Sequence, residues 1–576
     1  MVLSNSARMN LYEYFTLGCL EGGPNEIHVG TGLALIYNRV CFNEDCPDFP
    51  MQTLRQRLDA TNDFLIGVEL VTTRGTMKET KAKRTRALAA DLTHYDAVDW
   101  VSITDNAGGN PMLSPVALGK NILYGGKEVL IHLSCKDFNR HGLESEAWSL
   151  ASEGFHNILA LSGDYPADGY RGRAKPVFDI DSVALLTLLD EMNRGLDRPS
   201  RAQEGRSPLK PTEFYLGAVS TNFKRRENEV MPQLLKLEKK VAAGARFIIA
   251  QIGFDARKSD EMLVYLREKG HPDVHLIGNV FLMSLRVARF FRSQKIPGVV
   301  ISNDFLESCQ THGGGPDRGQ AFFRELAAKQ IAIFRGLGYR GAYLGGVHSL
   351  QEIQAILELE ASYSADDWRD FAKQIQYPLN DEFYLYERDP STKLTKPGKK
   401  SRTYADSLKA PRRASRNVTL GYRFSKWVHD WLFTPGTMCF RLGKKLFGSA
   451  RNPTQGPMAL RVIEHVSKST MYGCRDCGDC SLPDIAFLCP ESQCAKNQRN
   501  GPCGGTRDGK CEVEEFECIW ARAYDRLKYE GREHELLQNA PVIQDESLRG
   551  TSSWSNMFLG RDHHRYESSE EPDGGS

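Results

Sequence analysis

The chain has 576 residues, of which 41% are hydrophobic, and its 74 Lys and Arg residues nearly balance 73 Asp and Glu residues. A chain of this length is expected to form two or more domains, and a formal charge of +1 excludes a global attraction to nucleic acid or to an anionic membrane. No run of about 18 apolar residues and no leader-like start are present, so we expect a cytoplasmic protein without a membrane segment.

The N-terminal part of the chain predicts a barrel. Residues 1–60 are an extension to which the sequence assigns no role, and from 61 to 387 short β-branched apolar runs alternate with helical patterns such as 181–196 and 234–245. Eight strands at this spacing predict an α/β fold, a (β/α)8 TIM barrel, with an open doubly wound sheet as the alternative. The candidate strands are 64–71, 98–104, 128–133, 157–162, 214–219, 246–252 and 274–280, followed by 298–302 or 341–346.

The composition changes after the barrel. Residues 388–418 are predicted to form a basic linker, because positions 390–416 contain nine Lys or Arg residues, one Asp and three Pro residues. A basic docking strip for an acidic electron carrier is the alternative for this segment. A smaller cysteine-rich, metal-binding domain is expected over 419–535, and a disordered tail over 536–576.

Polar residues at the carboxyl ends of apolar barrel strands are the candidates for chemistry. They are Glu69, Thr104, His132, Asp164 and Gln251. A carboxylate within an apolar strand has a raised pKa unless it is paired, which suits a general acid, although a structural carboxylate paired with Lys or Arg is the alternative. A histidine at a strand end is more often a satisfied structural group than a catalyst.

The order of the motifs "GVEL", "VSITDNAGGNP", "IHLSCKDFNR", "ALSGDYP", "AGARFIIAQIGFD" and "IPGVVIS" resembles the methylenetetrahydrofolate reductase family, whose members are flavin-binding TIM barrels. The resemblance spans roughly residues 60 to 360. It implies a hydride transfer from reduced flavin N5 to the methylene carbon of 5,10-methylenetetrahydrofolate, after opening of the five-membered ring.

The resemblance also implies roles for single residues. Glu69 would be the proton donor to the folate, and Asp164 would stabilise developing positive charge and tune the flavin. Substrate contacts would come from Gln251 and from Leu285, which stands near the place of a folate-stacking phenylalanine. Contacts to the flavin, either FAD or FMN, would come from Thr104, His132, Ser162, Gly163, Asp164 and Phe178. Ser162 departs from the arginine found in many bacterial members.

Eight cysteines lie close together near the end of the chain. Thiolates separated by two residues point into one small volume, which suits an iron–sulfur cluster or, alternatively, zinc. The run "CGDCSLPDIAFLCPESQCAKNQRNGPCGGTRDGKCEVEEFECIW" resembles the C-terminal domain associated with methylenetetrahydrofolate reductases, which is linked with iron–sulfur clusters and electron delivery to the flavin. The predicted metal ligands are Cys474, Cys477, Cys480, Cys489, Cys494, Cys503, Cys511 and Cys518.

These features favour an oxidoreductase that interconverts 5,10-methylene- and 5-methyltetrahydrofolate, with NAD(P)H or ferredoxin as the electron donor. Two alternatives stay open at this point. One is a folate-dependent methyltransferase or demethylase without net redox chemistry, and the other is a non-catalytic electron-transfer subunit. A tetrahydrofolate derivative is the expected partner, nucleic acid is not, and a homo-oligomer is compatible with the sequence.

Overall fold

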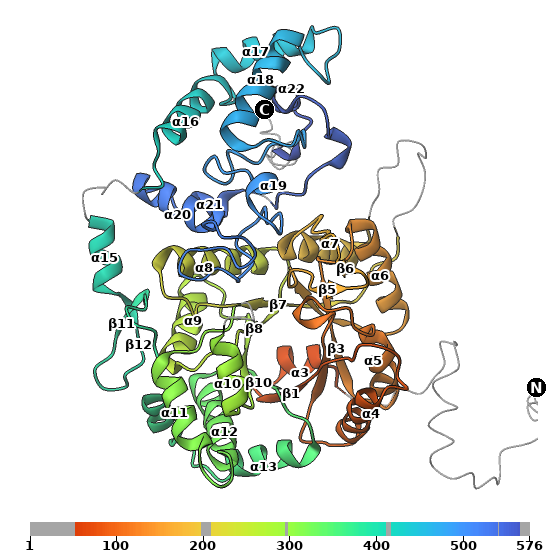
Figure 1. Ribbon diagram of the computed structural model, residues 1–576, viewed down its shortest axis with the longest axis vertical. Helices are drawn as coiled ribbons and strands as arrows, with labels where there is room; N and C mark the ends of the chain where they lie inside the picture. Colours follow the sequence, from red (N-terminus) through yellow and green to blue (C-terminus); the bar gives the residue numbers. More distant parts are fainter. Residues whose placement is uncertain (1–51, 197–208, 294–297, 410–415, 540, 565–576) are drawn as a thin grey trace, which may run out of the picture. The chain divides into compact units, whose positions relative to one another are not determined.

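A computed structural model describes residues 52–196, 209–293, 298–409, 416–539 and 541–564. Most of the predicted N-terminal extension, residues 1–51, and the end of the predicted tail, residues 565–576, lie outside the described residues. The remainder contains the barrel and the cysteine-rich domain (Figure 1).

Eight parallel strands close into a barrel in the order β1-β10-β9-β8-β7-β4-β3-β2. The predicted TIM barrel is therefore confirmed, and the doubly wound alternative is wrong. The eighth strand is 341–345, because β10 pairs with β1 and closes the sheet, whereas 298–302 lies in the loop before α11. The strands are β1 Leu65–Leu70, β2 Trp100–Ile103, β3 Glu128–Ser134, β4 Asn157–Leu161, β7 Tyr215–Ser220, β8 Phe247–Ala250, β9 His275–Phe281 and β10 Gly341–Gly345.

Large aromatic side chains fill the barrel interior opposite glycines. A methyl group on Gly67 would lie 2.2 Å from the ring of Trp100, and one on Gly217 would lie 2.2 Å from the ring of Phe247. The rings of Trp100 and Tyr343 stack with centroids 5.5 Å apart. These contacts make the lower barrel a packed core, so that open space is left at its mouth.

Helices surround the sheet and shield its outer face (Figure 1). Helix α7 begins after Asp181, whose side chain accepts hydrogen bonds from the backbone N–H groups of Val183 and Ala184, as expected for an N-cap. The helices of the barrel are α4 Thr80–Thr93, α5 Pro115–Tyr124, α6 Arg140–Ser152, α7 Ser182–Arg194, α8 Glu227–Ala242, α9 Ala256–Glu268, α10 Leu285–Arg292, α11 Asn303–Gly313, α12 Gln320–Leu337, α13 Leu350–Ala361 and α14 Trp368–Gln374.

Two segments outside the barrel, the end of the predicted extension and the predicted linker, are more ordered than the composition indicates. Helix α3, Leu54–Ala60, packs its leucines into the barrel core. The segment predicted as a linker contains β12, Thr395–Lys400, which pairs with β11, Tyr386–Arg388, and helix α15, Arg402–Lys409. One of its basic residues, Lys400, pairs with the carboxylate of Glu268 on α9 at 2.9 Å.

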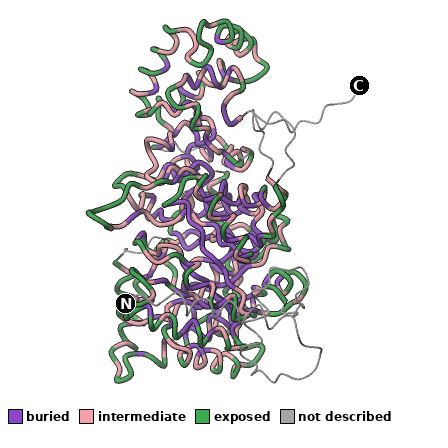
Figure 2. The backbone as a smooth tube through the Cα atoms, turned by 90° about the vertical axis from the view of Figure 1, so that its right-hand side faces the viewer, coloured by how far each residue is buried: buried purple, intermediate pink, exposed green. Residues whose placement is uncertain are grey.

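The cysteine-rich domain combines helices with long irregular loops. Its helix α20 packs on α8 of the barrel, where Trp520 and Tyr524 share a core with Val230 and Leu234. Figure 2 shows the buried backbone running through the barrel. The helices of this domain are α16 Leu420–Leu432, α17 Met438–Gly448, α18 Met458–Tyr472, α19 Pro490–Gln493, α20 Ile519–Glu530, α21 Glu535–Gln538 and α22 Ser553–Phe558.

The residues after the last cysteine continue to pack on this domain. Residues 541–564, which the composition places in a disordered tail, include a 3-10 turn at Glu546–Leu548 and helix α22. Asp479, fully buried, accepts a hydrogen bond from the backbone N–H of His563. In the described ranges no helix is long and apolar enough to cross a membrane.

Candidate active site at the barrel mouth

A cavity of about 290 Å³ lies at the carboxyl ends of the barrel strands. Lys496 and residues 502–505 of the cysteine-rich domain line its other side. The cavity brings together seven of the residues predicted from the sequence, which are Glu69, Thr104, His132, Ser162, Gly163, Asp164 and Gln251.

Glu69, at the floor of this cavity, belongs to a chain of hydrogen bonds that crosses the barrel. The Tyr343 hydroxyl donates to Glu69 Oε2 at 2.8 Å and lies 3.3 Å from Ser102 Oγ, which in turn is 2.8 Å from His132 Nε2. The partner of the carboxyl group is thus a tyrosine hydroxyl. Each member of the chain can pass a proton to the next.

Burial sets the protonation of both ends of this chain. It raises the pKa of Glu69, while the hydrogen bond from Tyr343 lowers it in part. Burial, with the nearby charge of Lys136, lowers the pKa of His132 to about 3. His132 is therefore neutral near pH 7, and Glu69 retains its proton to a higher pH than an exposed carboxyl group.

Polar atoms from strand-end loops, from β7 and from α8 line the cavity. Asp164 Oδ2 accepts a hydrogen bond from the Gly108 backbone N–H at 2.9 Å, which joins two strand-end loops. In the described part of the chain Thr104 Oγ1, Ser220 Oγ and Gln233 Nε2 are buried without a hydrogen-bond partner, and all three residues line the cavity. Buried polar groups of this kind call for a polar ligand.

The loop after β4 is held by the cysteine-rich domain. Ser162 Oγ lies 2.9 Å from Gln498 Oε1, and Lys236 Nζ on α8 donates to the same oxygen at 3.1 Å. Gly163, with φ of +85°, presents its carbonyl to Lys496 Nζ at 2.8 Å. The hydroxyl at position 162 therefore binds the second domain.

Four buried lysines line the cavity: Lys136, Lys236, Lys240 and Lys496. Burial, reinforced by the charge of Lys236, lowers the pKa of Lys240 to about 7. These cations favour an anionic group in the ligand. Lys236 and Lys240 could not be predicted from the sequence, because two lysines four residues apart on a helix have the pattern of a solvated helix face.

Two further predicted residues lie elsewhere. Phe178 is buried, with a φ of +41°, stacks on Tyr165 at 6.4 Å, and lines a neighbouring cavity together with Cys494 of the second domain. Leu285 begins α10 and packs against the barrel core and Gly313. Neither residue is part of the lining of the barrel-mouth cavity.

The eight clustered cysteines fall into two groups of four by their electrostatic contacts. In the first, which we call the outer group, Cys474 and Cys477 each interact with Cys480 and Cys489. In the second, the inner group, Cys494, Cys503, Cys511 and Cys518 interact with one another. Cys503 of the inner group lines the barrel-mouth cavity, which joins the predicted metal ligands to the predicted active site.

Cationic side chains accompany both groups. Lys468 Nζ lies 3.5 Å from Cys480 Sγ in the outer group. In the inner group, Lys496 pairs with Glu512, whose Oε1 is 3.5 Å from Cys503 Sγ. Burial alone would lower the pKa of Lys496, but Cys503 and Glu512 raise it above its ordinary value. Such cations offset the charge that thiolate ligands bring to a metal centre.

Two family profiles match these two regions. Residues 53–333 match methylenetetrahydrofolate reductase, and residues 457–546 match the C-terminal domain of methylene-tetrahydrofolate reductase. The chain belongs to the methylenetetrahydrofolate reductase family. The resemblance inferred from the motifs is confirmed for both regions.

Comparisons with whole proteins are more distant than these family profiles. No curated protein matches this methylenetetrahydrofolate reductase family member. A structure of an uncharacterised Clostridium thermocellum protein, described as binding two copies of 5-methyl-5,6,7,8-tetrahydrofolic acid, is 12% identical, with 53% of this chain and 97% of that chain covered and a TM-score of 0.39. Tryptophan synthase from M. tuberculosis is 12% identical (52% and 90% covered, TM-score 0.28). A putative deoxyribose-phosphate aldolase from Toxoplasma gondii is 13% identical (54% and 99% covered, TM-score 0.26).

The residues of this family member fit a flavin at the barrel mouth and metal in the cysteine domain. Unpartnered Thr104, Ser220 and Gln233 offer the donors and acceptors that a flavin ring edge needs. In the described residues no three cysteine sulfurs lie within 4.8 Å of one another. Four thiolates in each group match the ligand number of a structural zinc and of a four-iron cluster alike, so the cysteines fit either metal.

Proposed function

We propose that this chain is a flavin-dependent reductase that interconverts 5,10-methylenetetrahydrofolate and 5-methyltetrahydrofolate. The electrons come from NAD(P)H or through metal clusters held by the two cysteine groups. The observation that carries the proposal is the cavity in which a half-buried acid, Glu69, and a member of the inner cysteine group, Cys503, meet.

A bound flavin, either FAD or FMN, would supply the hydride. The protein itself would contribute an acidic proton, held by Glu69 at a defined position in the cavity. Glu69 holds that proton at the cavity floor, and the chain through Tyr343 and Ser102 to His132 orients it. Protonation of folate N10 by Glu69 would favour opening of the five-membered ring.

The loop above the floor would act on charge. Asp164 is fixed by the Gly108 N–H, so its carboxylate can stabilise positive charge that develops on the substrate. The buried lysines of the cavity would favour the negative charge of a reduced flavin or of a substrate carboxylate.

The cysteine domain supports the cluster route of electron delivery. Its inner group contacts the cavity through Cys503, and the outer group follows in the same domain. Four thiolates in each group match the ligand count of a four-iron cluster. The same count would also fit zinc, which an analysis of bound metals distinguishes.

The test is to purify the protein without oxygen, identify the flavin that it releases, and count iron and zinc on the same sample. We expect one flavin and about eight irons per chain, with about four irons lost in Cys511→Ala. Cys439→Ala, which changes a cysteine outside both groups, is the matched control and should keep all of them. Zinc without flavin would contradict the proposal and favour methyl transfer without redox chemistry.

A further inference from the structure

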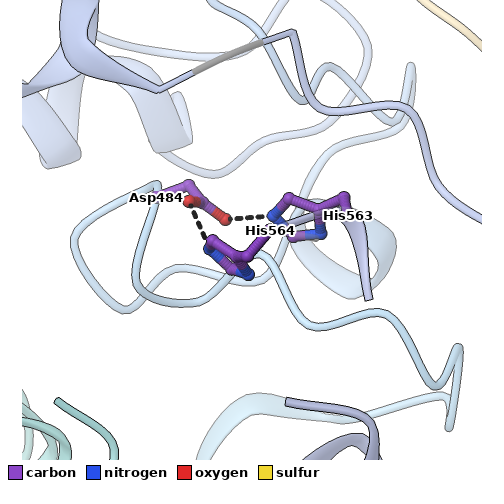
Figure 3. A group of neighbouring side chains, drawn as sticks. All are labelled: Asp484, His563 and His564. Atoms are coloured by element: carbon purple, nitrogen blue, oxygen red, sulfur yellow. Dashed lines mark hydrogen bonds and ion pairs between the residues drawn. The ribbon is translucent and has the colours of Figure 1, made fainter. Parts of the chain in front are cut away.

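A second set of metal-ligating side chains lies in the cysteine-rich domain, apart from the cysteines. Asp484, His563 and His564 each offer one ligand atom, and these atoms lie within 4.8 Å of one another (Figure 3). Asp484 and His563 are buried, and His564 is half-buried. Two imidazoles and one carboxylate form a ligand set that binds divalent transition metals.

The two histidines share one carboxylate. His563 Nε2 lies 3.1 Å from Asp484 Oδ2, and His564 Nε2 lies 3.2 Å from Asp484 Oδ1 (Figure 3). The two rings are adjacent, with centroids 4.0 Å apart and planes tilted by 34°. The Nε2 atoms of both rings therefore point to the carboxylate of Asp484.

The other nitrogen of each ring is already anchored. His563 Nδ1 bonds to Asp479, which is fully buried, and His564 Nδ1 lies 3.3 Å from Asp562 Oδ2. A carboxylate behind a ligating histidine fixes the orientation of the ring and increases its basicity, and it is the usual outer shell of a histidine metal site. The arrangement thus offers three side chains that can bind a metal and two carboxylates that hold the histidine rings in place.

Three carboxylates surround the two rings. Asp484 contacts both rings, Asp479 pairs with His563, and Asp562 lies 3.3 Å from His564 Nδ1. Their negative charge favours a divalent cation at this place.

Space and access are also present. Asp484 and His564 line a cavity of about 540 Å³, which leaves room for water or a small ligand at open coordination positions. A third histidine, His429, lines the same cavity, and its buried Nε2 has no hydrogen-bond partner among the described residues. The set is thus open on one side, unlike a closed structural site.

We propose that Asp484, His563 and His564 bind a divalent first-row transition-metal ion, such as zinc, at a site separate from the two cysteine groups. Both histidines lie beyond residue 546, where the match to the C-terminal family domain ends. Asp484 lies between the third and fourth cysteines of the outer group. A metal bound here would link residues 563 and 564 to the loop between Cys480 and Cys489.

The test compares zinc bound per chain after anaerobic removal of metal by a chelator and titration with zinc chloride. Zinc at the cysteine groups is common to all variants, so the difference isolates the new site. We expect His563→Gln/His564→Gln to bind one ion fewer than the wild type, and Asp562→Asn to bind this ion about 10- to 100-fold more weakly. His534→Gln, which changes an exposed histidine of the same domain, should match the wild type.

Equal zinc content in the wild type and the folded double variant would overturn the proposal. Folding is checked by circular dichroism and by Tm. If the double variant does not fold, X-ray absorption at the zinc edge of the wild type decides instead. Nitrogen and oxygen neighbours at about 2.0–2.2 Å are expected, and a shell of sulfur alone at about 2.3 Å would contradict the site.

Discussion

Replacing Glu69 by Gln removes the acidic proton and preserves the volume of the side chain. Flavin binding and flavin reduction should persist, while folate turnover falls about 10²- to 10⁴-fold, the usual contribution of a positioned acid. Anaerobic single-turnover kinetics measure the two steps separately. Glu128→Gln, at the opposite end of a barrel strand, should retain turnover, and normal turnover in Glu69→Gln would refute the acid assignment.

Tyr343 tunes the same acid. Its hydrogen bond to Glu69 lowers a pKa that burial raises, so Tyr343→Phe should raise that pKa further. A step that needs protonated Glu69 slows as the pH rises through the pKa of this group. In a plot of rate against pH for the folate half-reaction, the falling limb should therefore move to higher pH in Tyr343→Phe. A limb that stays in place, or moves to lower pH, would show that Glu69 does not control it.

Single residues also show what the sequence could predict about the site. Glu69, His132 and Asp164 lie together because the carboxyl ends of the parallel barrel strands meet at one face. This grouping follows from the predicted fold class alone. Lys496 and Cys503 complete the cavity from more than 300 positions away, and no local pattern indicates that approach.

At the scale of elements, periodicity predicted the barrel strands and failed where contacts are non-local. Residues 298–302 have an apolar strand pattern, and Val299 and Ile301 are buried, but β9 already pairs with β10. No strand edge is left for this segment, so it forms a loop. The polar residues 541–564 are ordered because partners such as Asp479 lie far away in the sequence.

The loop that carries Lys496 docks the cysteine domain on the barrel through polar contacts, among them the bond from Lys496 Nζ to the Gly163 carbonyl. Lys496 pairs with Glu512, and both side chains are almost buried, at 4% and 10% exposed. Lys496→Met leaves the carboxylate buried without its partner, which should cost about 3–5 kcal/mol of unfolding free energy.

The double variant Lys496→Met/Glu512→Gln removes both charges and should recover most of that loss. Chemical denaturation of the wild type, both single variants and the double variant measures the coupling. Additive losses in the double variant would show that the two side chains do not act as a pair.

Across the whole molecule, the proposed function would place electron entry, at the two cysteine groups, and folate chemistry in one chain. If electrons pass from the outer group to the inner group and then to the flavin, Cys477→Ala and Cys511→Ala should each abolish turnover supported by a reduced ferredoxin. Each should lose only the metal of its own group, about four irons. NAD(P)H that reduces the flavin directly would bypass both groups, so NAD(P)H-supported turnover should survive in the same variants. Ferredoxin-supported turnover at the wild-type rate in Cys477→Ala would exclude the outer group from the electron-transfer path. Loss of both ferredoxin- and NAD(P)H-supported turnover, with flavin still bound, would indicate that the cysteine groups support the active site structurally.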